Sequence, residues 1–192
     1  MAKVAIQTLD QRSLEWTKQA VVVVGASIFV AVCARVTVPL PFTPVPLTMQ
    51  NFGVLTVALL LGSRRGFAAL ALYLVEGASG LPVFSPSALG LHGIAQILGP
   101  TGGFLMAYPL AAFAAGWIYE HTSRRFGWAA LSGLAADIVL FIGGLSWLAA
   151  LTHSVSTAIK FGLYWFVFAE IIKILMAAGV ASRWHKQSLS QT

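Results

Sequence analysis

The sequence predicts an all-α, polytopic membrane protein: a bundle of about six transmembrane helices with both termini in the cytoplasm. Apolar residues make up 58% of the 192-residue chain, and charged residues make up only 9%. Soluble domains carry about 25% charged residues, so this chain has too few to cover a surface in water. Long apolar runs recur between short polar breaks, and we expect residues 1–192 to form a single integral membrane domain.

The charges divide the chain into spans, because charged side chains are costly in the hydrocarbon core. Residues 1–18 form a cytoplasmic N-terminal segment in this prediction, and residues 183–192 form a cytoplasmic tail. The proline-rich stretch 39–46 cannot continue a helix, since each ring removes a donor and blocks the preceding turn. The spans are expected at about residues 19–38, 47–61, 67–78, 101–119, 128–151 and 161–182.

The basic residues support this topology, because cytoplasmic loops of membrane proteins carry an excess of Lys and Arg. Only Arg35 and Lys160 fall outside when the N-terminus is placed inside. If the short span 67–78 did not cross, the two Arg-Arg pairs of the chain would lie on opposite sides. The bias also explains the net charge of +6 without a nucleic-acid partner. The residues placed in the cytoplasm are Lys3, Arg12, Lys18, Arg64, Arg65, Arg124, Arg125, Arg183 and Lys186.

Ionisable residues inside the spans mark a candidate site, because such side chains normally face the bundle interior. Glu170 and Lys173 are spaced i, i+3, so both project from one helix face. They form either an internal neutralising pair or a ligand clamp, in which the lysine meets an anionic group and the carboxylate accepts N–H bonds. Asp137 has no charged neighbour in sequence, which leaves open a structural hydrogen bond or a protonated carboxyl.

Polar and aromatic residues near the outer ends of the spans extend the candidate site. Gln50 and Asn51 begin the second span, where they either cap the helix and loop or face a cavity mouth. Trp147 belongs either to an interfacial aromatic belt or to an apolar wall around a ligand. Small residues such as Ser27 and Ala31 indicate either packing within the bundle or a docking face for another membrane subunit.

Motifs of common enzyme and metal sites are missing from the sequence. The glycine-rich segment 99–103 lacks the Gly-Lys-Ser/Thr ending of a phosphate loop, so we expect no nucleotide site. Its glycines are expected to allow a tight turn and a close approach of the backbone to a ligand. The histidines are scattered without an HExxH pattern, and no Gly-x-Ser-x-Gly elbow is present. The sequence therefore predicts no enzyme, no metal and no cofactor.

Several segments form a known signature when they are read together: residues 41–50 (PFTPVPLTMQ), 72–74 with 80–84 (LYL and GLPVF), 98–104 (LGPTGGF) and 144–148 (GLSWL). In this combination the chain resembles the BioY family, the biotin-specific substrate-binding (S) components of energy-coupling-factor (ECF) transporters. The last helix of that family typically carries Pro-Gly-Asp-Leu-Ile-Lys, whereas residues 168–173 here read FAEIIK. Glutamate thus replaces aspartate at Glu170, with charge and spacing retained.

The resemblance implies a six-helix protein of the bacterial cytoplasmic (inner) membrane that binds biotin near its extracytoplasmic side. Biotin and membrane lipid are then its expected small-molecule partners. It also implies a transmembrane coupling (T) subunit and two cytoplasmic ATPase subunits as partners, since this chain has no ATP motif. Lys173 is expected at the charge of biotin, Glu170 at its N–H groups, and Phe104 and Trp147 at its apolar ring. The candidate substrate-binding residues are Glu170, Lys173, Phe104, Asp137, Gln50 and Trp147.

The residues leave other readings open. A self-sufficient secondary carrier would use Asp137, Glu170 or both as proton sites, although the chain shows no obvious inverted repeats. An S component for a different vitamin would share the fold and the charged pair. Which end of biotin each polar residue meets, and whether the chain forms a homo-oligomer, also stay open.

Overall fold

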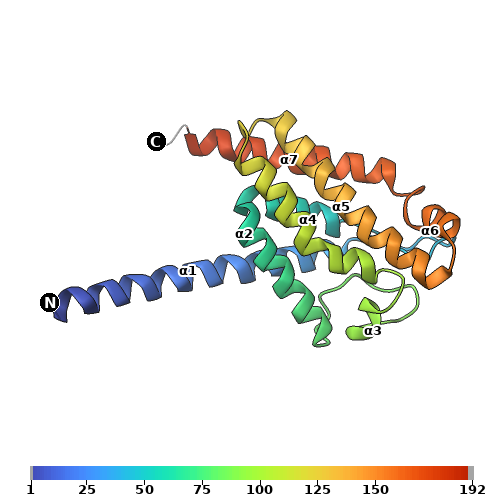
Figure 1. Ribbon diagram of the computed structural model, residues 1–192, viewed down its shortest axis with the longest axis horizontal. Coiled ribbons are helices and arrows are strands. Elements are labelled where there is room, and N and C mark those ends of the chain that lie inside the picture. Colours follow the sequence, from blue (N-terminus) through green and yellow to red (C-terminus); the bar gives the residue numbers. More distant parts are fainter. Residues whose placement is uncertain (1, 190–192) are drawn as a thin grey trace.

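The computed structural model of the chain describes the backbone of residues 2–189 and the side chains of residues 14–187. Figure 1 shows a bundle of long helices, with loops and short helices gathered at one end. The all-α prediction is confirmed, apart from one ladder of two residues per strand. The elements are α1 (Ala2–Arg35), β1 (Thr37–Val38), β2 (Leu47–Thr48), α2 (Gln50–Ala78), α3 (Ile94–Ile97), α4 (Gly102–Glu120), α5 (Phe126–Thr152), α6 (Val155–Gly162) and α7 (Val167–Leu189).

The helix α1 is longer than the predicted first span. It has 34 residues, which at 1.5 Å per residue is about 51 Å, and its N-terminal part projects beyond the bundle (Figure 1). The proline-rich stretch ends the helical run as predicted. However, the prediction that Leu47 and Thr48 begin the second span is wrong, because they pair with Val38 and Thr37 as strand β2. The two flanks of the proline-rich loop thereby satisfy each other's backbone groups.

The helix α2 changes direction sharply at Gly62, at the predicted break between the second and third spans. Gly62 has φ 82° and ψ −177°, a conformation that is essentially restricted to glycine. A Cβ placed on Gly66 would lie 3.3 Å from the Cα of Ala58. In a straight helix, residues eight apart are separated by about 12 Å along the axis. The two halves, residues 50–61 and 63–78, therefore form a sharp V (Figure 1).

The carboxylate of Glu120, at the end of α4, holds this reversal. It accepts hydrogen bonds from the Ser63 N–H at 3.2 Å and from the Ser63 hydroxyl at 2.7 Å. These bonds cap the first turn of the second half of α2, whose N–H groups lack intrahelical partners. The contact brings the Arg64–Arg65 and Arg124–Arg125 pairs to the same end of the bundle. Lys3 and Arg12, which also entered the topology prediction, lie outside the residues whose side chains are described.

We expect Glu120→Ala to lower the free energy of unfolding by about 1 kcal/mol, the usual effect of losing a helix cap. For a chain of this size the thermal midpoint in detergent should fall by about 2–4 °C. Glu120→Gln keeps an acceptor oxygen for Ser63, so its thermal midpoint should fall by less than that of Glu120→Ala. Equal midpoints for the alanine variant and the unsubstituted protein would contradict this role.

The last predicted span, residues 161–182, is divided in the structure. α6 and α7 meet at an angle of 50° across the break formed by residues 163–166. The Ser154 hydroxyl accepts a hydrogen bond from the Thr157 N–H at 3.2 Å, which caps α6. α7 then continues through most of the predicted cytoplasmic tail, while residues 190–192 lie outside the described part.

Small residues pack the helices against one another. Ser27 is fully buried and donates a hydrogen bond to Glu76 of α2. Of the two alternatives for Ser27, packing within the bundle therefore holds, because α2 covers this residue. Ala177 and Ala181 of α7 are also buried, and Gly133 of α5 lies against Ile174. These positions let the helix backbones approach closely.

Among the described residues, four helices are long and apolar enough to cross a membrane: α1 (from Leu14), α2, α4 and α5. The bent pair α6–α7 raises this number to five if it forms one span. α2 counts once, although its direction changes at Gly62. The protein is therefore a multi-pass, helical membrane protein.

Candidate ligand-binding site

A cavity lies between the helices beneath the loop that joins β1 and β2. Its volume is only about 50 Å³. The cavity is therefore narrow, and a ligand must move side chains apart to enter it. Its lining residues are Val45, Pro46, Thr48, Gln50, Asn51, Ser85, Thr101, Phe104, Leu105, Tyr108, Leu140, Phe141, Gly162, Phe166, Glu170 and Lys173.

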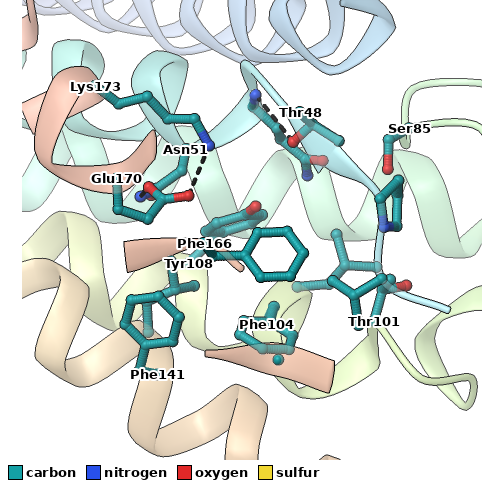
Figure 2. Close-up of a pocket in the computed structure, with 16 residues that line it drawn as sticks. Thr48, Asn51, Ser85, Thr101, Phe104, Tyr108, Phe141, Phe166, Glu170 and Lys173 are labelled. Carbon is teal, nitrogen blue, oxygen red and sulfur yellow. Dashed lines mark hydrogen bonds and ion pairs between the residues drawn. The ribbon is translucent and has the colours of Figure 1, made fainter. Parts of the chain in front are cut away.

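The predicted acid–base pair is formed and faces this cavity. The Lys173 ammonium donates to Glu170 Oε1 at 2.6 Å, and the two residues are only 5% and 6% exposed. Asn51 of α2 donates from Nδ2 to the other oxygen of Glu170 at 2.5 Å and to Asp137 Oδ1 of α5 at 2.8 Å. Three helices thus meet in one buried polar cluster, shown at one end of the site in Figure 2.

The aromatic wall of the cavity is built around Phe104. Its ring occupies a slot between two glycines: a Cβ on Gly144 would lie 2.2 Å from the ring, and a Cβ on Gly162 would lie 3.3 Å from it. Phe141 meets the same ring edge-on, with the centroids 6.2 Å apart. Larger residues at the two glycines would push Phe104 into the cavity, so the glycines set the width of the site.

Two buried polar atoms of the lining lack hydrogen-bond partners among the described residues. They are Gln50 Nε2, a donor, and Asn51 Oδ1, an acceptor. Buried polar groups are normally paired, because an unpaired one costs about 1–3 kcal/mol of desolvation. A ligand with one acceptor and one donor in the right places would satisfy these atoms.

The structure places the predicted site residues in two groups. Glu170, Lys173, Phe104 and Gln50 line the cavity, whereas Asp137 and Trp147 do not. Asp137 lies behind Asn51 and lines a groove between α5 and α7. The indole N–H of Trp147 instead donates to the carbonyl oxygen of Gly99 at 2.9 Å, which fixes the chain before α4.

Other parts of the site are missing from the predicted set. Tyr108 lines the cavity, but in sequence it looks like an ordinary apolar span residue. Thr101 also lines it, while Gly102 and Gly103 do not. A Cβ on Gly102 would lie 1.6 Å from the Ile97 carbonyl oxygen, so this glycine allows packing against α3. Gly102 and Gly103 were expected to let the backbone approach a ligand, but they lie outside the cavity lining.

The loop between β1 and β2 is held down over the cavity by contacts with the α6–α7 region. The Thr43 hydroxyl donates to the Phe161 carbonyl oxygen at 2.7 Å and accepts from the Val45 N–H at 3.2 Å. The rings of Phe42 and Trp165 lie 4.4 Å apart. Because Val45 belongs to the cavity lining, these contacts close the outer side of the site.

We expect Thr43→Val to loosen this loop. Losing one hydrogen bond of about 1 kcal/mol should raise amide hydrogen exchange in residues 39–46 by about fivefold. Thr152→Val is a matched control, because its hydroxyl bonds to Leu148 and Ser154 at the end of α5. Exchange in the loop that is equal in the two variants would show that Thr43 does not hold it.

Comparisons with known proteins agree with this architecture. The model of the BioY family matches residues 4–190. A protein from Thermotoga maritima named "Biotin transporter BioY" is 37% identical over 85% of this chain and 95% of its own length. "Biotin transporter BioY2" of Lactococcus lactis is 35% identical over 81% of this chain and 82% of its own length.

A solved structure shares the fold. The crystal structure of an S-component for biotin from an ECF-type ABC transporter superposes with a TM-score of 0.78. The match covers 90% of this chain and 93% of that one, at 24% identity. The predicted resemblance is thus confirmed by a family match over nearly the whole chain and by relatives above 30% identity: the chain belongs to the BioY family.

Proposed function

We propose that this protein captures biotin as the substrate-binding subunit of an ECF-type transporter of the bacterial cytoplasmic membrane. The observation that carries the proposal is the cavity that joins the buried Glu170–Lys173 pair to an aromatic wall. Members of the family that resemble this chain are named biotin transporters.

The chemistry of biotin fits this lining. The molecule has an apolar thioether ring between an anionic tail and a ureido head that carries N–H donors and a carbonyl acceptor. In Figure 2, Lys173, Glu170 and Asn51 gather at the upper left of the site, whereas Ser85 and Thr101 lie at its right. Polar groups at two ends of an apolar site suit a ligand with two polar ends.

The roles of the predicted residues follow from their positions. Lys173 and Glu170 meet polar atoms of biotin directly, Phe104 contacts its apolar ring, and Gln50 Nε2 donates to an acceptor of the ligand. Trp147 acts indirectly, because its bond to Gly99 positions the turn before Thr101. Asp137 also acts indirectly, through its bond with Asn51.

We further propose six crossings, with the cytoplasm at the end where both termini lie. α1, the two halves of α2, α4, α5 and the bent pair α6–α7 would each cross once. Figure 1 supports this arrangement, because the start of α1 and the end of α7 lie at the same end of the bundle. Arg64, Arg65, Arg124 and Arg125 are exposed near the reversal of α2 at that end. Tags on the two termini should both be reached only from the cytoplasm; tags on opposite faces would contradict this topology.

The partners follow from the proposed role. The sequence carries no nucleotide-binding motif, so any ATP-driven uptake must use other chains. An ECF-type transporter supplies it through a transmembrane coupling subunit and two cytoplasmic ATPase subunits. Membrane lipid covers the remaining apolar faces, among them the exposed side of α1 with Val21, Val24 and Ile28.

Titration of the purified chain with biotin, thiamine and riboflavin tests the function directly. We expect saturable binding of biotin alone, measured in detergent by calorimetry. Binding of thiamine or riboflavin in preference to biotin would reassign the ligand, and no binding of biotin at saturating amounts would end the proposal. Uptake by the chain alone in vesicles, driven by a proton gradient without ATPase partners, would favour a secondary carrier.

A further inference from the structure

The side-chain amide of Asn51 has only one orientation that its neighbours allow. Its Nδ2 lies 2.8 Å from Asp137 Oδ1 and 2.5 Å from Glu170 Oε2. Glu170 is paired with Lys173, so its carboxylate accepts hydrogen bonds and cannot donate them. Turning the amide over would bring the carbonyl oxygen of Asn51 against this carboxylate, so the N–H groups of Asn51 face Glu170 and Asp137.

This orientation leaves Asn51 Oδ1 as a fixed acceptor at the cavity. Asn51 is 3% exposed, lines the cavity, and its Oδ1 has no hydrogen-bond partner among the described residues. A buried acceptor without a partner is unfavourable, and an N–H donor of a ligand would satisfy it. A water molecule is the ordinary partner of such an acceptor, and a ligand must replace it.

The charges around Asn51 favour the same kind of ligand group. Asp137 and Glu170 approach it from α5 and α7, while Lys173 is the only cation bonded within this cluster of described residues. Lys173 is already paired with Glu170. The surroundings of Asn51 are therefore rich in acceptors, which attract an N–H group of a ligand and repel its carboxylate.

We infer that Asn51 Oδ1 accepts a hydrogen bond from one N–H of the ureido ring, which makes Asn51 a specificity-determining residue. Asp137 is a positioning residue, because it holds the amide of Asn51 in the orientation that presents Oδ1. The inference rests on the proposed function and adds the direction of the ligand. The ureido ring lies toward the junction of α2, α5 and α7, and the anionic tail lies toward the hydroxyls of Ser85 and Thr101 (Figure 2).

The experiment compares three ligands on two forms of the protein. Affinities are measured for biotin and for each of its two analogues with one ureido nitrogen methylated, on the unsubstituted chain and on Asn51→Leu. The unsubstituted chain should prefer biotin to one of the analogues by more than about tenfold. In Asn51→Leu biotin should bind about 10–100-fold more weakly, while that analogue loses less than about threefold, since its methyl group can pack against leucine. Equal losses for biotin and both analogues would overturn the role of Asn51.

Two variants of Asp137 separate the effect of its acceptor oxygen from the effect of its charge. Asp137→Asn retains a carbonyl oxygen that can hold the Nδ2 of Asn51, whereas Asp137→Leu does not. We expect Asp137→Asn to keep the preference for biotin within about threefold and Asp137→Leu to lose it. Loss of the preference in both variants would show that charge acts instead, and retention in both would show that Asp137 is not needed.

Two controls separate the possible failures. Thr56→Val removes, from the same helix but outside the cavity lining, a buried hydroxyl that has no hydrogen-bond partner among the described residues, and it should leave all three affinities unchanged. Asn51→Ser is a smaller second variant if Asn51→Leu does not fold, and it should also lose preference. If the unsubstituted chain fails to bind biotin, the proposed function fails. If it binds biotin with no preference over either analogue, only the role of Asn51 fails.

Discussion

Lys173→Ala is expected to raise the Kd for biotin by at least about 100-fold, or about 2.7 kcal/mol. The ammonium of Lys173 is buried and lies 2.6 Å from Glu170 Oε1, so its removal takes away a ligand donor and leaves a buried carboxylate without its cation. Truncating one member of a buried charge pair typically costs several kcal/mol, much of it from the unpaired partner. Calorimetry on purified, folded variant in detergent measures the change.

A double variant separates recognition of the ligand from stability of the fold. Glu170→Gln with Lys173→Met removes both charges and leaves no unpaired one, and such replacements often keep or raise stability. We expect the double variant to have a thermal midpoint close to that of the unsubstituted protein but to bind biotin only weakly. Unchanged affinity in Lys173→Ala would remove Lys173 from the site.

Gly144→Ala is expected to weaken biotin binding by more than about tenfold, because overpacking typically costs about 1–3 kcal/mol. A Cβ at this position would lie 2.2 Å from the ring of Phe104. The ring cannot move toward α6, where Gly162 already lies close to it. It must therefore move into a cavity that has a volume of only about 50 Å³.

The same helix provides a control for Gly144→Ala. Gly127 has no atom within 4 Å of an added Cβ, so Gly127→Ala should leave the Kd for biotin unchanged. Adding Phe104→Leu to Gly144→Ala should restore part of the affinity, because the smaller side chain makes room for the methyl group. If Gly144→Ala binds biotin normally, the ring has another place to go and does not set the width of the site.

The sequence alone was sufficient for features that depend on composition or on neighbours along the chain. The scarcity of charge identifies a membrane protein, and the prolines of residues 39–46 end the first helix. The break at Gly62 was visible from its flanking glycine and arginines. The pairing of Glu170 with Lys173 follows from i, i+3 spacing, since one helical turn brings such side chains together.

Other features were beyond the reach of the sequence because they depend on how separate helices pack. Asn51 meets Asp137 and Glu170, which are 86 and 119 residues away, and no local pattern sets those distances. Trp147 looked like a wall residue, but packing turns its indole toward Gly99 instead of into the cavity. The break between α6 and α7 was also missed, because the apolar composition of residues 161–182 suits a straight helix as well as a bent one.

Composition and the order of charges thus determined that this chain lies in a membrane and carries a buried acid and base on one helix face. Only the tertiary structure decided which groups surround that pair, how wide the cavity is, and which atoms are left free for a ligand. The reason is that the backbone fixes geometry over a few residues, whereas contacts between distant helices arise from side-chain packing across the whole bundle.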